Sequence, residues 1–278
     1  MSPSRVFLLT ALAMLAFAGN SLLCRAALHG TGIDAATFTL LRIVAGAAAL
    51  SLIVRLRDGR SELAGNWPSA FALFAYAAAF SFAYVGLTAA TGALLLFGAV
   101  QATMIGVGLV RGERLAGAQA LGLACALAGL VGLLLPGLSA PPLTSALLML
   151  AAGVAWGVYS LRGKGGGDPL RVTAGNFLRA VAFAAALGVI NLHGASLDSA
   201  GVVYAVASGA LASGVGYAVW YSALPALKVA SAATVQLTVP VIAAVGGMAL
   251  LGEPPTWRFL VAAVAILGGI ALVVRPRR

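Results

Sequence analysis

The sequence predicts an all-α integral membrane protein, with ten transmembrane helices in two inverted five-helix repeats around a central cavity. Hydrophobic residues make up 62% of the chain and charged residues only 9%, which leaves too little polar surface for a globule in water. Residues 115–161 contain no charge, although about 20 apolar residues suffice to cross a bilayer. Residues 41–50 recur as residues 178–187, each inside a long apolar run. Such internal repeats are typical of transporters.

Turn-forming residues divide the chain into ten expected spans. The clearest break is at residues 135–142, where Leu-Pro-Gly-Leu-Ser-Ala-Pro-Pro separates two apolar arms, because proline and glycine end helices. The third and fourth spans are interrupted only at residues 88–91, which must form the turn. The expected spans are residues 6–28, 33–54, 68–87, 89–110, 115–135, 143–161, 170–192, 199–223, 229–251 and 257–274.

The amino terminus resembles a secretory signal. Arg5, the apolar stretch that follows it and Ala16-Phe17-Ala18 imitate a signal peptide with its cleavage site. We expect this segment to be retained as the first span, because the second half of the chain contains a counterpart that cleavage would leave unpaired.

Basic residues predict the orientation, because lysine and arginine accumulate in cytoplasmic loops. They occupy every second connection, whereas the other loops hold only Arg258, with Arg25 near a span end. We therefore expect both termini in the cytoplasm of a bacterial-type cell, with the protein in the inner membrane. The net charge of +10 indicates anchoring at an anionic membrane surface and no nucleic-acid partner. The basic connections contain Arg5, Arg55, Arg57, Arg60, Arg111, Arg114, Arg162, Lys164, Arg171, Lys228, Arg275, Arg277 and Arg278.

The repeat extends beyond its arginine segment. Gly112-Glu113-Arg114 recurs as Gly252-Glu253-Pro254, and Pro136 recurs as Pro276. Five spans per copy is an odd number, so the copies must lie in opposite orientations across the membrane. We expect the first five-helix repeat at residues 1–137 and the second, inverted one at residues 138–278.

These features resemble the drug/metabolite transporter superfamily, whose ten-span members consist of two EamA-type halves. The resemblance covers nearly the whole chain and includes the mid-span arginines and the Gly-Glu steps after the fourth and ninth spans. Residues 18–21, Ala-Gly-Asn-Ser, are similar to the family's Trp-Gly-Ser-Asn pattern with the tryptophan replaced, and residues 155–157 keep Trp-Gly. The resemblance implies a secondary transporter that works by alternating access without ATP hydrolysis and needs no cofactor.

Among family members, the aromatic-rich cavity is most similar to the bacterial amino-acid exporters. The resemblance therefore implies export of amino acids with apolar or aromatic side chains, a range that could extend to other amino acids. The alternative is efflux of drugs or of other small metabolites such as nucleosides. A monomer would suffice, and a homodimer is the other possibility.

Arg42 and Arg179 are the arginines of the repeated segment and lie near the middle of their spans. There an unpartnered cation costs roughly 3 kcal/mol or more. One hypothesis is that one of them binds a substrate carboxylate. The other, which the symmetry favours, is that both tie neighbouring helix ends or carbonyl groups together.

Aromatic residues suggest the wall of a cavity. Tyr76, Phe80 and Tyr84 recur at helical spacing on one face of the third span. Tyr217, Trp220 and Tyr221 do likewise on the eighth span. These two faces could meet across the pseudo-two-fold axis and line one cavity. The alternative is that the rings only pack against other helices or face lipid. This alternative is weaker for tyrosine and tryptophan, because their polar tips need partners when buried. The remaining aromatic candidates are Trp156 and Tyr159.

Neutral polar residues and backbone irregularities complete the candidate set. Asn20, Gln101, Asn176 and Gln236 are expected to bind substrate, with bridging between helices as the alternative; Ser81 and Ser213 are weaker candidates. Pro240 lacks a backbone donor and is expected to kink the ninth span, exposing carbonyl groups, unless the kink is inert. The expected hinges for conformational change are Gly98, Gly214, Gly216 and Pro240.

The sequence argues against an enzyme and against a metal site. All seven acidic residues lie in or beside predicted loops, and Glu113 and Glu253 are expected to cap helices or to pair with Arg114 and Arg258. No carboxylate is then available inside the membrane for a proton relay, which favours facilitated efflux or weakly coupled exchange. There is no phosphate-binding loop, and Cys24 and Cys125 lack nearby ligands. A channel would need a continuous polar lining, which the sequence does not provide.

Overall fold

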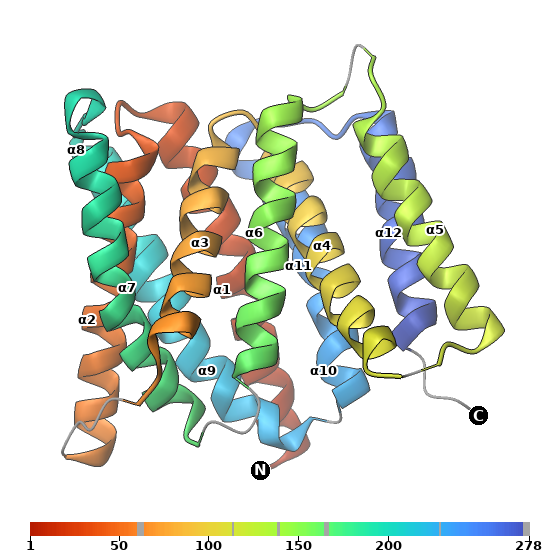
Figure 1. Ribbon diagram of the computed structural model, residues 1–278, viewed down its shortest axis with the longest axis horizontal. Helices are drawn as coiled ribbons and strands as arrows, with labels where there is room; N and C mark the ends of the chain where they lie inside the picture. Colours follow the sequence, from red (N-terminus) through yellow and green to blue (C-terminus); the bar gives the residue numbers. More distant parts are fainter. Residues whose placement is uncertain (60–63, 113, 138–139, 164–166, 228, 275–278) are drawn as a thin grey trace.

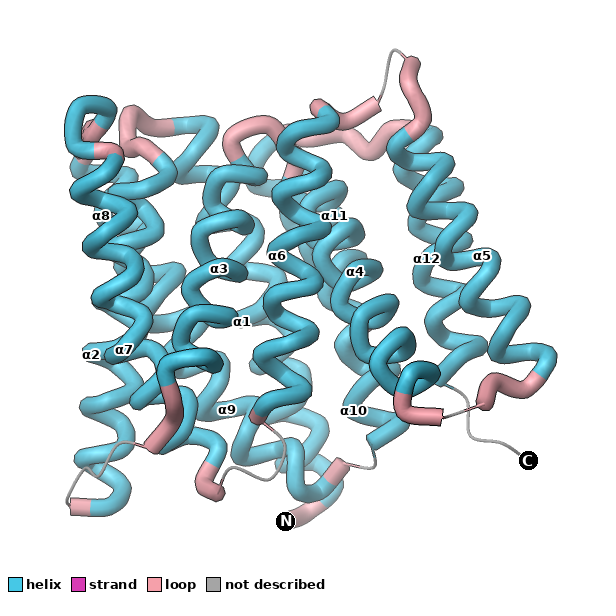
Figure 2. Tube along the Cα trace, in the orientation of Figure 1, coloured by secondary structure: helices cyan, strands magenta, loops and turns pink. Residues whose placement is uncertain are grey.

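The computed structural model describes residues 1–59, 64–112, 114–137, 140–163, 167–227 and 229–274, and every regular element in them is helical (Figure 1). Short loops join the helices (Figure 2). The first half contains α1 (Pro3–Gly30), α2 (Ala35–Asp58), α3 (Trp67–Tyr84), α4 (Ala89–Val110) and α5 (Gly117–Leu134). The second half contains α6 (Leu143–Arg162), α7 (Pro169–Ile190), η1 (Leu192–Gly194), α8 (Ser199–Val206), η2 (Ala207–Val215), α9 (Gly216–Ala223), η3 (Leu224–Ala226), α10 (Val229–Gln236), α11 (Thr238–Leu251) and α12 (Trp257–Val274).

The expected spans coincide with these helices. Within the described residues, nine helical segments are long and apolar enough to cross a membrane, counting residues 199–226 as one. The third expected span forms α3, which is 18 residues long but is not among the nine. Its proline, serines and tyrosines lower its hydropathy, and they include side chains of the candidate site. A tenth crossing by α3 therefore stays a prediction.

Side-chain caps explain where several helices begin. Asp34 accepts hydrogen bonds from the N–H groups of Ala36 and Thr37 at the start of α2, and Asp168 caps α7 in the same way. Thr88 caps α4, which confirms the expected turn between the third and fourth spans. Such oxygens satisfy N–H groups that have no partner within the helix.

The helices run antiparallel in succession, and both termini lie at the same end of the bundle (Figure 1). In the centre, α2 packs against α7, α3 against α6 and α7, and α4 against α6 and α11, while α1 packs against η2, α9 and α11. At one edge, α5 and α12 form a pair that touches the remainder chiefly through α4. Gly153 and Gly157 face Ala99 and Thr103 of α4, and because neither glycine has a side chain, α6 approaches α4 closely.

Two spans depart from a continuous α-helix. In the eighth, residues Ala207–Val215 form a π-helix between α8 and α9, an arrangement that often marks functional sites. There the backbone at Gly209 lies so close to α2 that a Cβ atom would collide with the carbonyl oxygen of Arg42. The ninth span is interrupted between α10 and α11, three residues before Pro240, which cannot donate a backbone hydrogen bond.

Candidate functional site

A cluster of aromatic rings lies where helices of both halves meet. The ring of Trp156 on α6 lies 4.8 Å from Tyr76 of α3, 5.3 Å from Tyr159 and 5.5 Å from Tyr217 of α9, centroid to centroid. The Trp156 and Tyr217 rings stack with an interplanar angle of 15°. Phe80 extends the cluster along α3, 5.4 Å from Tyr76. Trp156 thus connects the aromatic face of the third span, through Tyr76, to that of the eighth span, through Tyr217. A direct meeting of the two faces stays a prediction.

A fourth helix, α1, contributes a ring that the sequence analysis missed. Phe17 lies 5.7 Å from Tyr217 and 6.1 Å from Trp220. Phe177 of α7 lies 6.1 Å from Tyr217. The only signal for Phe17 in the sequence is its position one turn before Asn20 and Ser21 on α1, because the phenylalanine alone is indistinguishable from a lipid-facing residue.

Arg42 lies beside this cluster, in the middle of α2, and is 3% exposed. Its Nη2 atom donates a hydrogen bond to Oδ1 of Asn20 at 3.2 Å. The same oxygen accepts a second hydrogen bond from Ser208 of η2 at 2.6 Å. The amide nitrogen of Asn20 in turn donates to the hydroxyl of Tyr76 at 3.4 Å. Asn20 therefore connects α1, α2, α3 and the π-helix.

The surroundings of Arg42 are aromatic. Its guanidinium carbon lies 5.0 Å from the ring centre of Phe80 and 6.0 Å from those of Phe38 and Tyr76. Each cation–π contact is worth about 0.5–2 kcal/mol, against a cost of roughly 3 kcal/mol or more for a cation at the centre of a membrane span. The rings offset much of this cost but bring no negative charge.

One nitrogen of Arg42 forms no hydrogen bond with the part of the chain that the structure describes. Among the described residues, Nη1 is a buried donor that reaches no acceptor. None of the ion pairs between described residues includes this arginine. A buried donor without an acceptor costs about 1–3 kcal/mol, and more when it is charged. This part of the site is therefore polar, positively charged and incompletely satisfied.

Arg179 has a different environment, although residues 178–187 around it are similar in sequence to residues 41–50 around Arg42. Its Nη1 atom donates to the carbonyl oxygens of Ala64 and Gly175, both at 2.9 Å. Ala64 belongs to the connection between α2 and α3. Arg179 thus ties α7 to a loop, as the alternative hypothesis expects, and lies apart from the aromatic rings of the cluster.

Asn176 links the same loop to the aromatic cluster. Its Oδ1 atom accepts a hydrogen bond from the backbone of Asn66 at 2.9 Å, and its nitrogen donates to the hydroxyl of Tyr159 at 3.4 Å. The hydroxyl of Tyr159 donates a hydrogen bond to the hydroxyl of Thr173, which in turn donates to the hydroxyl of Tyr221. These contacts satisfy the polar tips of the tyrosines.

One end of the bundle is closed by an ion pair between Arg25 and Glu253. Their side-chain atoms lie 2.6 Å apart, and Arg25 also donates to the carbonyl oxygens of Tyr84 and Val85. Glu253 accepts a hydrogen bond from the backbone of Ala89. Ala89 is the first residue of α4, so this bond fulfils the expectation that Glu253 caps a helix. The alternative, a pair with Arg258, is not formed, because Arg258 donates to the carbonyl oxygen of Leu135. Glu113 lies outside the described residues.

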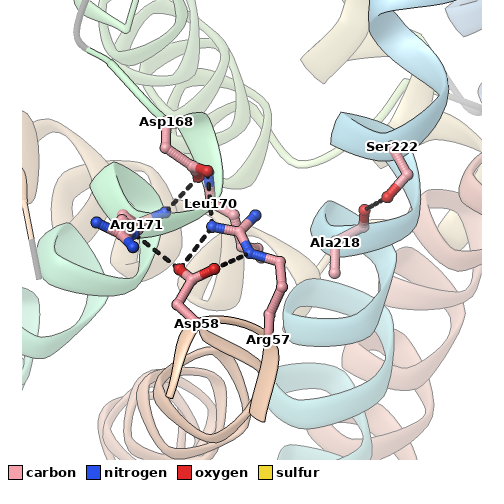
Figure 3. A network of polar contacts seen from close by, with 7 residues as sticks. All are labelled: Arg57, Asp58, Asp168, Leu170, Arg171, Ala218 and Ser222. Atoms are coloured by element: carbon pink, nitrogen blue, oxygen red, sulfur yellow. Dashed lines mark hydrogen bonds and ion pairs between the residues drawn. The ribbon is translucent and has the colours of Figure 1, made fainter. Parts of the chain in front are cut away.

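At the opposite end of the bundle, four charged residues join α2 to α7 (Figure 3). Arg57 contacts Asp58 at 2.8 Å and Asp168 at 2.6 Å, and Arg171 contacts Asp58 at 2.8 Å. Burial raises the pKa of Asp168, but hydrogen bonds from the Arg171 backbone and from Arg57 outweigh burial, so its pKa is lower than the ordinary value. Asp168 therefore keeps its negative charge near neutral pH.

Comparisons with known proteins agree with this architecture. Residues 143–275 match the EamA-like transporter family. A probable terminal-alkyne amino-acid exporter of Streptantibioticus cattleyicolor is 30% identical over 267 residues, which cover 90% of this chain and 87% of that protein. This chain belongs to the EamA-like transporter family. An uncharacterised protein of Pseudomonas aeruginosa is 62% identical to this EamA protein over 279 residues, covering all of this chain and 97% of the relative.

The fold of this EamA transporter also occurs among solved structures. A crystal structure titled only as that of a protein superposes with a TM-score of 0.68 over 98% of both chains, at 21% sequence identity. Members of the family are transporters rather than enzymes. The protein is accordingly a multi-pass membrane transporter. Over the part of the chain that the structure describes, no group of three His, Cys, Asp or Glu side chains could hold a metal ion.

The remaining candidates of this EamA protein are scattered. Gln101 is buried in α4, and Gln236 is the last residue of α10. Gly98 lines a small apolar pocket between α4, α5 and α12, with a volume of about 10 Å³, room for about one water. Gly214 lies in the π-helix and Gly216 starts α9. Sequence reasoning missed Ser208 and Gly209, which bring the π-helix against Asn20 and Arg42.

Proposed function

We propose that this protein exports amino acids with apolar or aromatic side chains across a bacterial inner membrane, by alternating access and without ATP hydrolysis. The observation that carries the proposal is the position of the aromatic cluster. Tyr76, Trp156 and Tyr217 come from both halves of the chain. Charged contacts lie at each end of the bundle, namely the Arg25–Glu253 pair at one end and the Arg57 network at the other. We propose that these contacts are the two closures of the transport site. A carrier needs such a site between two seals that open in turn.

The two closures differ in the helices they join. At the end away from the termini, Arg25 and Glu253 connect α1 to the segment between α11 and α12. At the end near the termini, the Arg57 network joins α2 to α7 (Figure 3). Opening one closure leaves the contacts of the other intact, so that helices can rock about the aromatic cluster.

The helix pairings support an inverted repeat, which we place at residues 1–137 and 138–278. If the halves are related by a two-fold axis, each contact must have a counterpart. The relation exchanges α1 with α6, α2 with α7, α3 with the eighth span (α8, η2 and α9) and α4 with the ninth span (α10 and α11). The contact between α4 and α6 then corresponds to that between α1 and α11, and the contact between α3 and α7 to that between α2 and η2. The pairs α2·α7 and α5·α12 map onto themselves. A pseudo-two-fold axis gives the inward-open and outward-open states similar energies.

Charge supports an orientation with both termini in the cytoplasm. The end of the bundle that carries the termini also carries Arg55, Arg57, Arg111, Arg162 and Arg171. Other basic residues of these connections, Arg60, Lys164, Lys228, Arg275, Arg277 and Arg278, lie outside the described residues. The positive-inside tendency places this end on the cytoplasmic side.

The substrate class rests on the aromatic cluster and on the relative named as a probable terminal-alkyne amino-acid exporter. Stacked rings bind apolar and aromatic side chains well. Acidic residues of the described chain sit at helix ends or in connections, so no carboxylate stands at the centre of a span to couple transport to protons. Facilitated efflux or exchange follows from this distribution.

The experiment that tests the proposal is counterflow with the purified protein in proteoliposomes. Vesicles preloaded with an unlabelled amino acid are supplied with the same labelled amino acid, using phenylalanine, threonine and glutamate in turn, with protein-free vesicles as the control. We expect accelerated uptake in the order phenylalanine, threonine, glutamate.

Two outcomes would contradict the proposal. Absence of exchange with every amino acid, in protein that elutes as one folded species, would move the substrate to drugs or nucleosides. Uphill accumulation driven by an imposed pH gradient would contradict uncoupled transport.

A further inference from the structure

We propose that Arg42 recognises the substrate's negative charge, and that its free Nη1 atom binds the carboxylate of the transported solute. This inference rests on the proposed function, because it assigns the anionic subsite of the same transport site. It excludes Arg179, the other arginine of the repeat, from this role.

The guanidinium of Arg42 is held in place with one side unused. Asn20 receives the hydrogen bond from Nη2, and Ser208 and Tyr76 fix Asn20 in turn. The Nη1 atom is buried and reaches no acceptor among the described residues. An arginine that served only to join α1 and α2 would gain from an acceptor at both nitrogens. The unused donor indicates a partner that binds reversibly.

The missing partner must be negatively charged. Other neighbours of the guanidinium include the rings of Phe38, Tyr76 and Phe80, which attract the cation without neutralising it. A carboxylate would supply both the missing acceptor and the missing charge. Arginine is well suited to it, because its N–H groups match the geometry of carboxylate oxygens.

The position of Arg42 connects this charge to the aromatic cluster. Tyr76 contacts both the guanidinium, at 6.0 Å, and Trp156, at 4.8 Å. A carboxylate bound at Nη1 therefore lies one side chain away from the stacked rings. The two subsites together fit a small solute that carries a carboxylate next to an apolar or aromatic group.

Arg179 provides a matched control within the same repeat. It already donates to two carbonyl oxygens, which hold a loop against α7. Removal of its charge should weaken the fold without changing the recognition of solutes. Removal of the Arg42 charge should do the reverse, because none of the ion pairs between described residues includes this cation.

The test compares phenylalanine, phenylalaninamide and 3-phenylpropionate, which separate the carboxylate from the amine. We measure inhibition of phenylalanine counterflow, and thermal stabilisation of the purified protein in detergent, for the wild type, R42Q, R42K and R179Q. In the wild type, phenylalanine and 3-phenylpropionate should bind at least tenfold more tightly than phenylalaninamide. This preference should disappear in R42Q, recover in part in R42K and persist in R179Q. The melting temperature without solute should fall in R179Q and not in R42Q.

The results separate this inference from the proposed function. Counterflow that persists in R42Q with an unchanged preference for carboxylates overturns the role of Arg42 and leaves amino-acid transport standing. Absence of counterflow in the wild type, together with carboxylate stabilisation that R42Q abolishes, overturns transport and supports the subsite. Sodium chloride at equal ionic strength serves as a control, and equal stabilisation by chloride would overturn the carboxylate assignment. If no carboxylate stabilises the wild type and none is transported, both ideas fail.

Discussion

Arg25 and Glu253 form an ion pair, with Nε 2.6 Å from Oε1, between α1 and the segment that follows α11. Both side chains are largely buried, with exposures of 10% and 12%. Arg25 also reaches the end of α3 through the carbonyl oxygens of Tyr84 and Val85, and Glu253 reaches the start of α4 through Ala89. One pair of charges thus holds four segments together at one end of the bundle.

Loss of both charges should destabilise the protein by less than the sum of the two single losses. A single substitution, R25Q or E253Q, leaves an uncompensated buried charge, and we expect each to cost about 3 kcal/mol. The double variant should cost clearly less than the sum, with a coupling of about 1–3 kcal/mol. Thermal or denaturant unfolding of the four proteins in one detergent measures this cycle. Additive effects would show that the pair contributes nothing as a pair.

The same ion pair should control access to a natural thiol. Cys24 adjoins Arg25 and is fully buried. In a C125S background, E253Q should open this end and accelerate reaction of Cys24 with a water-soluble maleimide. A shift of 1.4 kcal/mol in the opening equilibrium increases the labelling rate about tenfold. D168N, which weakens the opposite closure, is the control and should not accelerate labelling. Equal rates for E253Q and the parent would disprove a seal at Arg25.

Stability should be insensitive to pH from 8 to 5 and should decrease below about pH 4. Burial raises the pKa of Asp34, but hydrogen bonds from Ser196, Thr37 and Ala36 outweigh the effect of burial, so that the pKa of Asp34 is lower than its ordinary value. The pKa of Asp168 is lowered too. A carboxyl group of this kind contributes stability that is complete above its unfolded pKa, about 4, and that is lost as the pH falls through the folded pKa. Melting temperatures in detergent across this range measure the effect.

The control for the pH dependence is the D34N/D168N double variant. It should start from a lower melting temperature and lose less of it in acid, because neither side chain can take up a proton. A loss of stability between pH 8 and 6 in the wild type would instead point to a group other than these aspartates.

The helices and the aromatic faces were predictable from local patterns. Apolar runs broken by turn-forming residues locate the long helices of the described residues, since helix length is limited by bilayer thickness. Tyr76 and Phe80 share a face because residues four apart stack along a helix, and their rings are in contact. These features depend on residues close together in the chain, which is why composition and spacing suffice.

Three features depend on distant contacts and were not predictable. Glu253 pairs with Arg25, 228 positions away, rather than with a neighbouring arginine. Arg42 and Arg179 share a local sequence, but one faces Asn20 and aromatic rings while the other meets a loop carbonyl. The π-helix at Ala207–Val215 consists largely of small residues, and its close fit against α2 is a property of tertiary packing that composition does not encode.

Gly209 should tolerate no side chain. A Cβ atom there would collide with the backbone of Arg42, so G209A must push the π-helix away from α2 and should cost about 1–3 kcal/mol. G268A in α12 is the matched control, because no atom lies within 4 Å of its added Cβ. Alanine is the better helix former by about 1 kcal/mol, so G268A should be neutral or stabilising. Comparable melting temperatures for the two variants would refute the close contact.

Trp156 should set the preference for large apolar substrates. It stacks on Tyr217 and contacts Tyr76 and Tyr159. W156A removes these ring contacts, which are worth about 0.5–1.5 kcal/mol each. We expect the half-saturation concentration in counterflow to rise about tenfold for phenylalanine, equivalent to 1.4 kcal/mol, and to change little for free alanine, whose methyl group needs no ring. W156F, which keeps a ring, should lie between W156A and the wild type.

Trp67 supplies the control for the loss of a tryptophan. It is 55% exposed at the start of α3 and contacts only one described ring, that of Phe183. W67A should therefore leave the ratio of phenylalanine to alanine transport unchanged, even if it lowers the melting temperature slightly. If W156A reduces the transport of both amino acids by the same factor, Trp156 supports the bundle without selecting the substrate. A change confined to phenylalanine places the side chain of the solute against the stacked rings, since only a direct contact distinguishes two solutes that share the same charged groups.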